Sequence, residues 1–136
     1  MNEAVKITPE QYDIIADIQQ QTLVKLASNV PAIEILNALC SLAESVLSNA
    51  VASIMLTDRS IGLLSVLCAP SLPQEGHEAL ANIKPGPSGG SCGNAVFSNQ
   101  AQFVQNTFED ERWKDLRQVA FDLNLCACWS MPIRDE

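Results

Sequence analysis

Apolar residues recur at helical spacing in the first third of the chain. Over residues 9–27 they form a stripe that three consecutive glutamines dilute, so this face is narrower than that of a core helix. The segment Thr8-Pro9-Glu10-Gln11 supplies a hydroxyl cap, a proline at the first helical position and a glutamine three residues after the cap. After a break at Asn29-Val30-Pro31, residues 31–48 have a much wider apolar face. We expect the first helix to extend away from the main core and the second to be buried.

Shorter apolar runs follow, and they are typical of strands and short helices. Residues 52–57 and 62–68 flank a polar turn and predict an antiparallel hairpin. The rest of the pattern predicts a short helix at 71–82, an irregular loop at 84–90, a helix at 92–98, a strand at 102–105, a helix that begins at Asp110 and carries Trp113, and a last strand at 125–133. Hairpin strands that alternate with helices, without regular crossovers, predict a mixed α/β (α+β) fold: a central antiparallel sheet flanked by helices.

Length and charge narrow the possible functions. The chain has 136 residues, of which 47% are hydrophobic and 18% charged, which predicts one globular domain. Its net charge of −8 repels phosphate groups, so we expect no nucleic-acid partner. The first residues do not resemble a signal peptide, and no apolar stretch is long enough to span a membrane. We therefore expect a cytoplasmic chain with no membrane contact.

The five cysteines indicate neither a disulfide framework nor a metal site. Their number is odd and their spacing irregular, which favours reduced thiols. Cys126 and Cys128 lie two apart on a predicted strand, so they point to one face and cannot readily bridge to each other. The one histidine, His77, lies on a polar helix and leaves both a zinc site and a catalytic triad incomplete. We expect no metal, no haem or other cofactor, and no enzymatic activity.

Four segments together resemble one protein family. They are Ala69-Pro70-Ser71-Leu72-Pro73, Gly89-Gly90-Ser91-Cys92-Gly93-Asn94-Ala95, Trp113-Lys114-Asp115-Leu116-Arg117 and Cys126-Ala127-Cys128-Trp129-Ser130-Met131-Pro132-Ile133. They are similar to the A-P-S-L-P, G-S-C-G-x-A, W-x-x-x-R and A-C-W-S-x-P-I stretches of GAF domains in bacterial histidine kinases and in diguanylate cyclases or phosphodiesterases. The resemblance extends over about residues 31–133.

This resemblance implies a six-stranded antiparallel sheet, a pocket on one face covered by the glycine-rich segment, and dimerisation through flanking helices. We accordingly expect a linker or dimerisation helix over residues 1–29 and a GAF domain over residues 30–136. Relatives follow P-I with one further strand, whereas here Arg134-Asp135-Glu136 ends the sequence, so we expect the domain to lack its final strand. The segment Phe103–Phe108 also lacks the acidic residue that follows the corresponding strand in relatives.

The glycine-rich segment carries the clearest binding chemistry. Its glycines allow backbone amides to approach a ligand, and the start of the next helix adds unpaired N–H groups that favour an anion or a carbonyl oxygen. The same glycines also fit a tight loop-to-helix turn that binds nothing. Spacing likewise allows Trp113 to be a core residue and Arg117 to form a surface salt bridge. The predicted ligand contacts are Gly90, Ser91, Cys92, Gly93, Asn94, Trp113, Arg117 and Trp129.

The leading functional hypothesis is a regulatory domain that senses a small molecule in a bacterial signal-transduction protein. The first helix would pair in a homodimer and couple the domain to an output domain, such as a histidine kinase or a diguanylate cyclase, in two-component or cyclic di-GMP signalling. One alternative uses Cys92, whose position at a helix start favours a thiolate, in a thiol redox sensor or a methionine sulfoxide reductase-like enzyme with Cys126 or Cys128 as the second thiol. Another is a dimerisation or scaffold module without a ligand.

Overall fold

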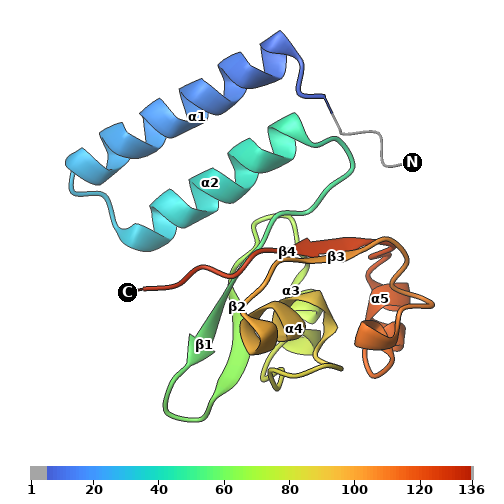
Figure 1. Cartoon of the computed structure of the whole chain (residues 1–136). Coiled ribbons are helices and arrows are strands. Elements are labelled where there is room, and N and C mark those ends of the chain that lie inside the picture. Colours follow the sequence, from blue (N-terminus) through green and yellow to red (C-terminus); the bar gives the residue numbers. More distant parts are fainter. Residues whose placement is uncertain (1–5, 136) are drawn as a thin grey trace. The chain divides into compact units, whose positions relative to one another are not determined.

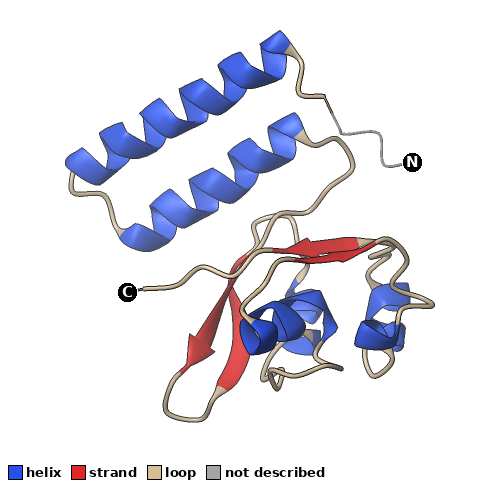
Figure 2. Cartoon of the chain, in the orientation of Figure 1, coloured by secondary structure: helices blue, strands red, loops and turns tan. Residues whose placement is uncertain are grey.

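The computed structural model describes residues 6–135, which form two compact units (Figure 1). The first consists of residues up to 54 together with residues 68–71, and the second of residues 55–67 and 72–135. Figure 2 shows helices and antiparallel strand pairs, which confirms the predicted mixed α/β class. None of the described helices is both long and apolar enough to cross a membrane.

Two helices, α1 (Pro9–Ala27) and α2 (Ala32–Val46), lie side by side in the first unit (Figure 1). The predicted start of α1 is confirmed: the Thr8 hydroxyl accepts a hydrogen bond from the backbone N–H of Gln11 at 3.2 Å, and the Gln11 side chain accepts one from the N–H of Thr8 at 2.9 Å. No residue of α1 is buried, whereas α2 buries Ile35 and Cys40. The narrow and wide apolar faces of the sequence therefore correspond to an exposed and a partly buried helix.

Two small sheets provide the strands. The hairpin pairs β1 (Ile54–Asp58) with β2 (Leu63–Cys68), and a second pair joins β3 (Gln102–Val104) to β4 (Cys128–Ser130). The second pair is antiparallel, with Gln102 opposite Ser130, Phe103 opposite Trp129 and Val104 opposite Cys128. The six-stranded sheet that the family resemblance implied is not formed by the described residues. The last strand is shorter than predicted, since the backbone N–H of Leu125 bonds to Ala120 O at 2.8 Å and closes the preceding helix instead.

The second unit also contains α3 (Gln74–Ala79), α4 (Gly90–Ser98), the 3₁₀ turn η1 (Glu111–Trp113) and α5 (Arg117–Asp122). The prediction of a single helix from Asp110 onward was wrong, because η1 and α5 are separate elements. The Asp110 carboxylate caps η1 through the N–H of Arg112 at 3.0 Å, and the backbone at Leu116 leaves the helical region before α5 begins. Arg112 also binds this carboxylate through its guanidinium and lowers the pKa of Asp110 to about 2.

The core of the second unit lies between β3, η1 and α5. Val104, Trp113 and Ala120 are buried together there, and Leu116, Leu125 and Cys128 pack against them. Because residues alternate along a strand, Cys128 and Ser130 point to one face of β4 and Trp129 to the other. Of these three residues, only Trp129 was predicted to contact a ligand, and it lies on the face opposite Cys128 and Ser130.

Candidate functional site

The first turn of α4 packs closely against η1, and this packing requires glycine. Gly90 has a φ of +68°, and a Cβ there would lie 3.0 Å from Leu116 Cδ1 and 3.6 Å from the Trp113 ring. A Cβ on Gly89 would lie 2.7 Å from the carbonyl oxygen of Lys84. The consecutive glycines therefore allow a tight approach of one part of the chain to another.

Ser91 is a polar junction inside the second unit. Its side chain is buried, and its hydroxyl accepts a hydrogen bond from Trp113 Nε1 at 2.9 Å. The same hydroxyl donates to the backbone carbonyl of Cys128 at 3.4 Å. Ser91 and Trp113 were both predicted to contact a ligand, and the structure brings them into contact with each other. Their hydrogen bonds link α4, η1 and β4.

Two thiols meet where α4 lies against β4. Cys92 extends from the first turn of α4, and its Sγ lies 3.1 Å from the Ser130 hydroxyl. Cys128 lies two residues before Ser130 on the same face of β4, and its Sγ lies 3.8 Å from that hydroxyl. Both cysteines are only partly buried. One serine therefore sits between two thiols that the sequence separates by more than 30 residues.

The two thiols have opposite pKa shifts. A hydrogen bond from Cys92 lowers the pKa of Cys128 to about 6, and the hydroxyls of Ser91 and Ser130 act in the same direction against burial. The same bond, together with burial, raises the pKa of Cys92 above its usual range. The shifts therefore favour the proton on Cys92 and the negative charge on Cys128, the reverse of the thiolate that the helix start led us to expect at Cys92.

The other predicted site residues lie apart from this junction. Asn94 donates from Nδ2 to the carbonyl oxygen of Pro87 at 3.3 Å, so it holds the glycine-rich loop. Arg117 lies 3.8 Å from the Glu111 carboxylate, the salt bridge that we had left as an alternative. Trp129 is 64% exposed and packs edge to face on Phe103, with ring centroids 5.9 Å apart. It lies on the face of β4 opposite Cys128, so one small ligand cannot contact both.

Sequence reasoning missed Ser130 and Arg112. Ser130 was within reach of the alternation argument, because it occupies the same strand face as Cys128. Arg112 binds the Gln102 side chain at 2.9 Å and the carbonyl oxygen of Phe103 at 3.2 Å, and so ties η1 to β3. No short motif indicates that contact, since it depends on the fold.

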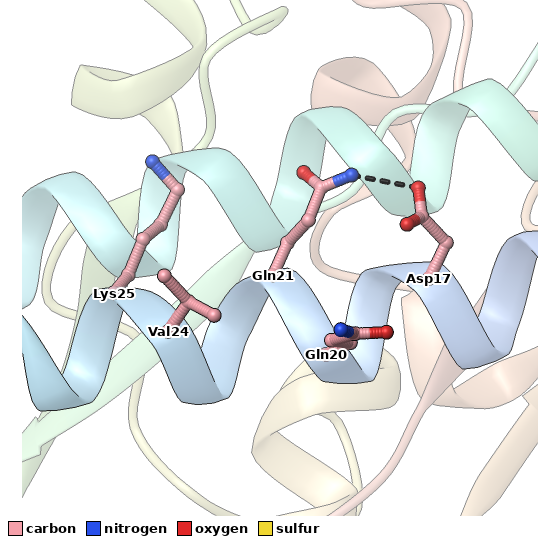
Figure 3. A pocket seen from close by; sticks show the side chains of 5 residues that line it. All are labelled: Asp17, Gln20, Gln21, Val24 and Lys25. Atoms are coloured by element: carbon pink, nitrogen blue, oxygen red, sulfur yellow. Dashed lines mark hydrogen bonds between the residues drawn. The ribbon is translucent and has the colours of Figure 1, made fainter.

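Two hollows occur elsewhere on the described surface. One, of about 400 Å³, lies beside the hairpin in the second unit, and its lining comprises Leu56, Asp58, Ile61, Ser65, Val66, Leu67 and Asn82. The other is a shallow depression on α1, where Gln21 donates to the Asp17 carboxylate at 2.7 Å (Figure 3). Neither hollow is lined by a residue that was predicted to bind the ligand. Across residues 6–135, no three His, Cys, Asp or Glu side chains are grouped to hold a metal ion.

Comparison with known proteins fits this architecture. The sequence profile described as GAF domain matches residues 31–136, most of the chain. The chain belongs to the GAF domain family. The compact units of the structure do not follow the bounds of this match, because α1 and α2 pair in the first unit.

The GAF domain also resembles a curated sensor protein. It is 29% identical over 115 residues to the methyl sulfide methyltransferase-associated sensor of Methanosarcina acetivorans, an alignment that covers 85% of this chain and 12% of that protein. This relative is archaeal, whereas we had expected bacterial relatives. No solved structure matches the chain significantly. The family and this relative support a regulatory sensing domain.

The lowered pKa of Cys128 predicts how the rate of its alkylation by iodoacetamide depends on pH. In a Cys126→Ser background, which leaves one thiol on this strand, the rate should rise with a midpoint near pH 6, because the thiolate is the reacting form. Cys92→Ala removes the hydrogen bond that lowers the pKa of Cys128, so the midpoint should move toward the ordinary thiol value of 9.0. Mass spectrometry of the alkylated peptide measures both. A midpoint near 9.0 in the parent protein, or one that Cys92→Ala leaves in place, would contradict the assignment.

Proposed function

We propose that this GAF domain is a non-enzymatic module of a larger cytoplasmic signalling protein, that it binds a small molecule, and that α1 passes its state to an output domain. The observation that carries this proposal is the outer face of α1. Tyr12, Leu23 and Leu26 are 61%, 66% and 61% exposed there. Exposed large apolar side chains on one helix face are typical of an interaction surface.

The spacing of this face supports pairing with a second copy. Tyr12, Ala16, Gln19, Leu23 and Leu26 are all exposed, and they follow one another at intervals of four and three residues. This is the heptad repeat of a coiled coil, with one polar residue in the middle. Ile15 and Ile18 are half-buried and lie beside the stripe, so the packed side of α1 and the heptad stripe are different faces. A homodimer through α1 would hold two copies of the domain in a fixed arrangement relative to each other.

The hollow beside the hairpin supports small-molecule binding. Its volume falls within the usual range of ligand sites, and its lining combines apolar side chains with a few polar ones, as such sites do. Leu56, Ile61 and Leu67 are exposed around it, and Asp58 and Asn82 supply polar groups. Binding at Gly90–Asn94 would instead require α4 to move away from its neighbours, because Gly90, Ser91 and Gly93 are buried. The hollow is therefore the first contact that we propose for a ligand.

The output domain belongs to the proposal too. The chain spans 12% of the length of its curated relative, which is named a sensor. A histidine kinase or a diguanylate cyclase elsewhere in the full-length protein would suit a GAF input module with a pairing helix, because coiled coils transmit changes in helix position between domains.

Fragment screening by thermal shift tests ligand binding. A fragment at 100 times its Kd should stabilise the domain by about 2.7 kcal/mol, since it binds only the folded state. Ile61→Arg places a charge in the lining of the hollow and should abolish the shift. Val96→Arg, on the exposed side of α4, is the matched control and should preserve it. The hollow would be ruled out as a ligand site if no fragment raised the melting temperature of the parent domain, or if fragments stabilised the Ile61→Arg and Val96→Arg variants equally.

Light scattering coupled to size exclusion tests the pairing helix. The parent chain should be a dimer, and Leu23→Glu should weaken dimerisation at least tenfold, because it places a charge in the heptad stripe. Val24→Glu is the matched control: the neighbouring residue is also exposed but lies about 100° away around the helix, outside the stripe, and should leave the dimer intact. A monomeric parent chain, or equal losses in the two variants, would refute pairing through α1.

A further inference from the structure

We propose that Cys92 and Cys128 form a reversible intramolecular disulfide when the domain meets a hydroperoxide, with Cys128 as the first thiol to react and Cys92 as the second. This modification site goes beyond the proposed binding of a small molecule. It would give the domain a second input, an oxidant, at the contact between α4 and β4.

Geometry brings the two sulfur atoms together. Both approach the same Ser130 hydroxyl, Cys92 at 3.1 Å and Cys128 at 3.8 Å. They come from separate elements, α4 and β4, which pack together and which the hydrogen bond from the Ser91 hydroxyl to the carbonyl oxygen of Cys128 joins. A disulfide between them would join two elements that already pack together.

The hydrogen bonds decide which thiol reacts first. They lower the pKa of Cys128 and raise that of Cys92, which favours the thiolate at Cys128, and the thiolate is the nucleophile in thiol chemistry. Cys128 is also partly exposed, which admits a molecule as small as hydrogen peroxide. The raised pKa of Cys92 keeps its proton in place until the second step.

The reaction balances in two steps. The Cys128 thiolate attacks one peroxide oxygen, the O–O bond breaks, and the other oxygen leaves and takes up a proton from solvent, which forms water and Cys128 sulfenic acid. The Cys92 sulfur then attacks the Cys128 sulfur, the S–O bond breaks, and the departing hydroxide combines with the Cys92 proton to form water. Overall, the two thiols lose two electrons and one peroxide is reduced.

The first unit contains a second thiol pair that acts as an internal control. Cys40 on α2 and Cys68 at the end of β2 have their sulfur atoms 3.8 Å apart, yet both residues are only 3% exposed. Burial, together with the hydrogen bond to Cys68, raises the pKa of Cys40 to about 12, so this thiol stays protonated. Proximity alone would favour both pairs. Thiolate formation and access to oxidant favour Cys92 and Cys128.

Peptide mapping of the oxidised full chain tests the proposal. The reduced protein is treated with equimolar hydrogen peroxide, denatured, alkylated with N-ethylmaleimide and cleaved after glutamate, which separates Cys92 from Cys68 at Glu75 and Glu78 and from Cys128 at Glu109 and Glu111. We expect one cross-linked species that joins the Cys92 peptide to the peptide 112–136, in which fragmentation places the link at Cys128 and maleimide at Cys126, and which a reductant separates, while Cys40 and Cys68 carry maleimide. Oxidation confined to Cys126, a Cys40–Cys68 cross-link at the same dose, or sulfinic acid at Cys128 without a cross-link would overturn the proposal.

Three variants assign the two roles. Cys92→Ser should leave Cys128 as a sulfenic acid that dimedone traps, whereas Cys128→Ser should lower oxidation at Cys92 at least tenfold. Cys40→Ser is the matched control, and its rate of Cys92–Cys128 cross-linking should stay within about twofold of the parent rate. Circular dichroism establishes that each variant is folded before oxidation. Dimedone labelling of Cys92 in the Cys128→Ser protein at the parent rate would reverse the assigned order of attack.

Discussion

The hydrogen bond from the Trp113 indole to the Ser91 hydroxyl is the contact on which the second unit depends. Both groups are buried, so removal of either one would leave the other without this partner and would destabilise the folded state. The bond exists because Gly89 and Gly90 carry no Cβ that would keep α4 away from its neighbours. Once α4 is seated there, its next residue, Cys92, lies against β4 beside Ser130. A packing constraint therefore positions the thiols.

The two faces of β4 have different surroundings. On the inner face, Cys128 and Ser130 contact α4 and the buried cluster. On the outer face, Trp129 packs on Phe103 and remains largely exposed. The family motif that includes these residues therefore supplies both structural and chemical groups from one short strand. The proposed oxidant-sensitive pair and the proposed ligand hollow both belong to the second unit, while the proposed pairing helix belongs to the first.

Local signals were predictable from the sequence, and contacts between distant segments were not. The bounds of α1 were predicted correctly because its capping box lies within four consecutive residues. The helix predicted from Asp110 was wrong because the periodicity of Trp113 and Leu116 was compatible with one helix, while the fold places them in η1 and in the turn that follows. The family was identified from four short motifs, each a run of consecutive residues that can be recognised without the fold. The partners of Ser91 and Cys92 lie at least 22 residues away, so only the fold could reveal them.

A double-mutant cycle between Ser91 and Trp113 tests the central claim most directly. The free energy of unfolding is measured by urea denaturation for the parent, Ser91→Ala, Trp113→Phe and the double variant. If the hydrogen bond holds α4 in place, the double variant should be more stable than the sum of the single losses predicts, by about 1 kcal/mol or more. Losses that add within about 0.5 kcal/mol would show that the two side chains are independent, and would contradict the account.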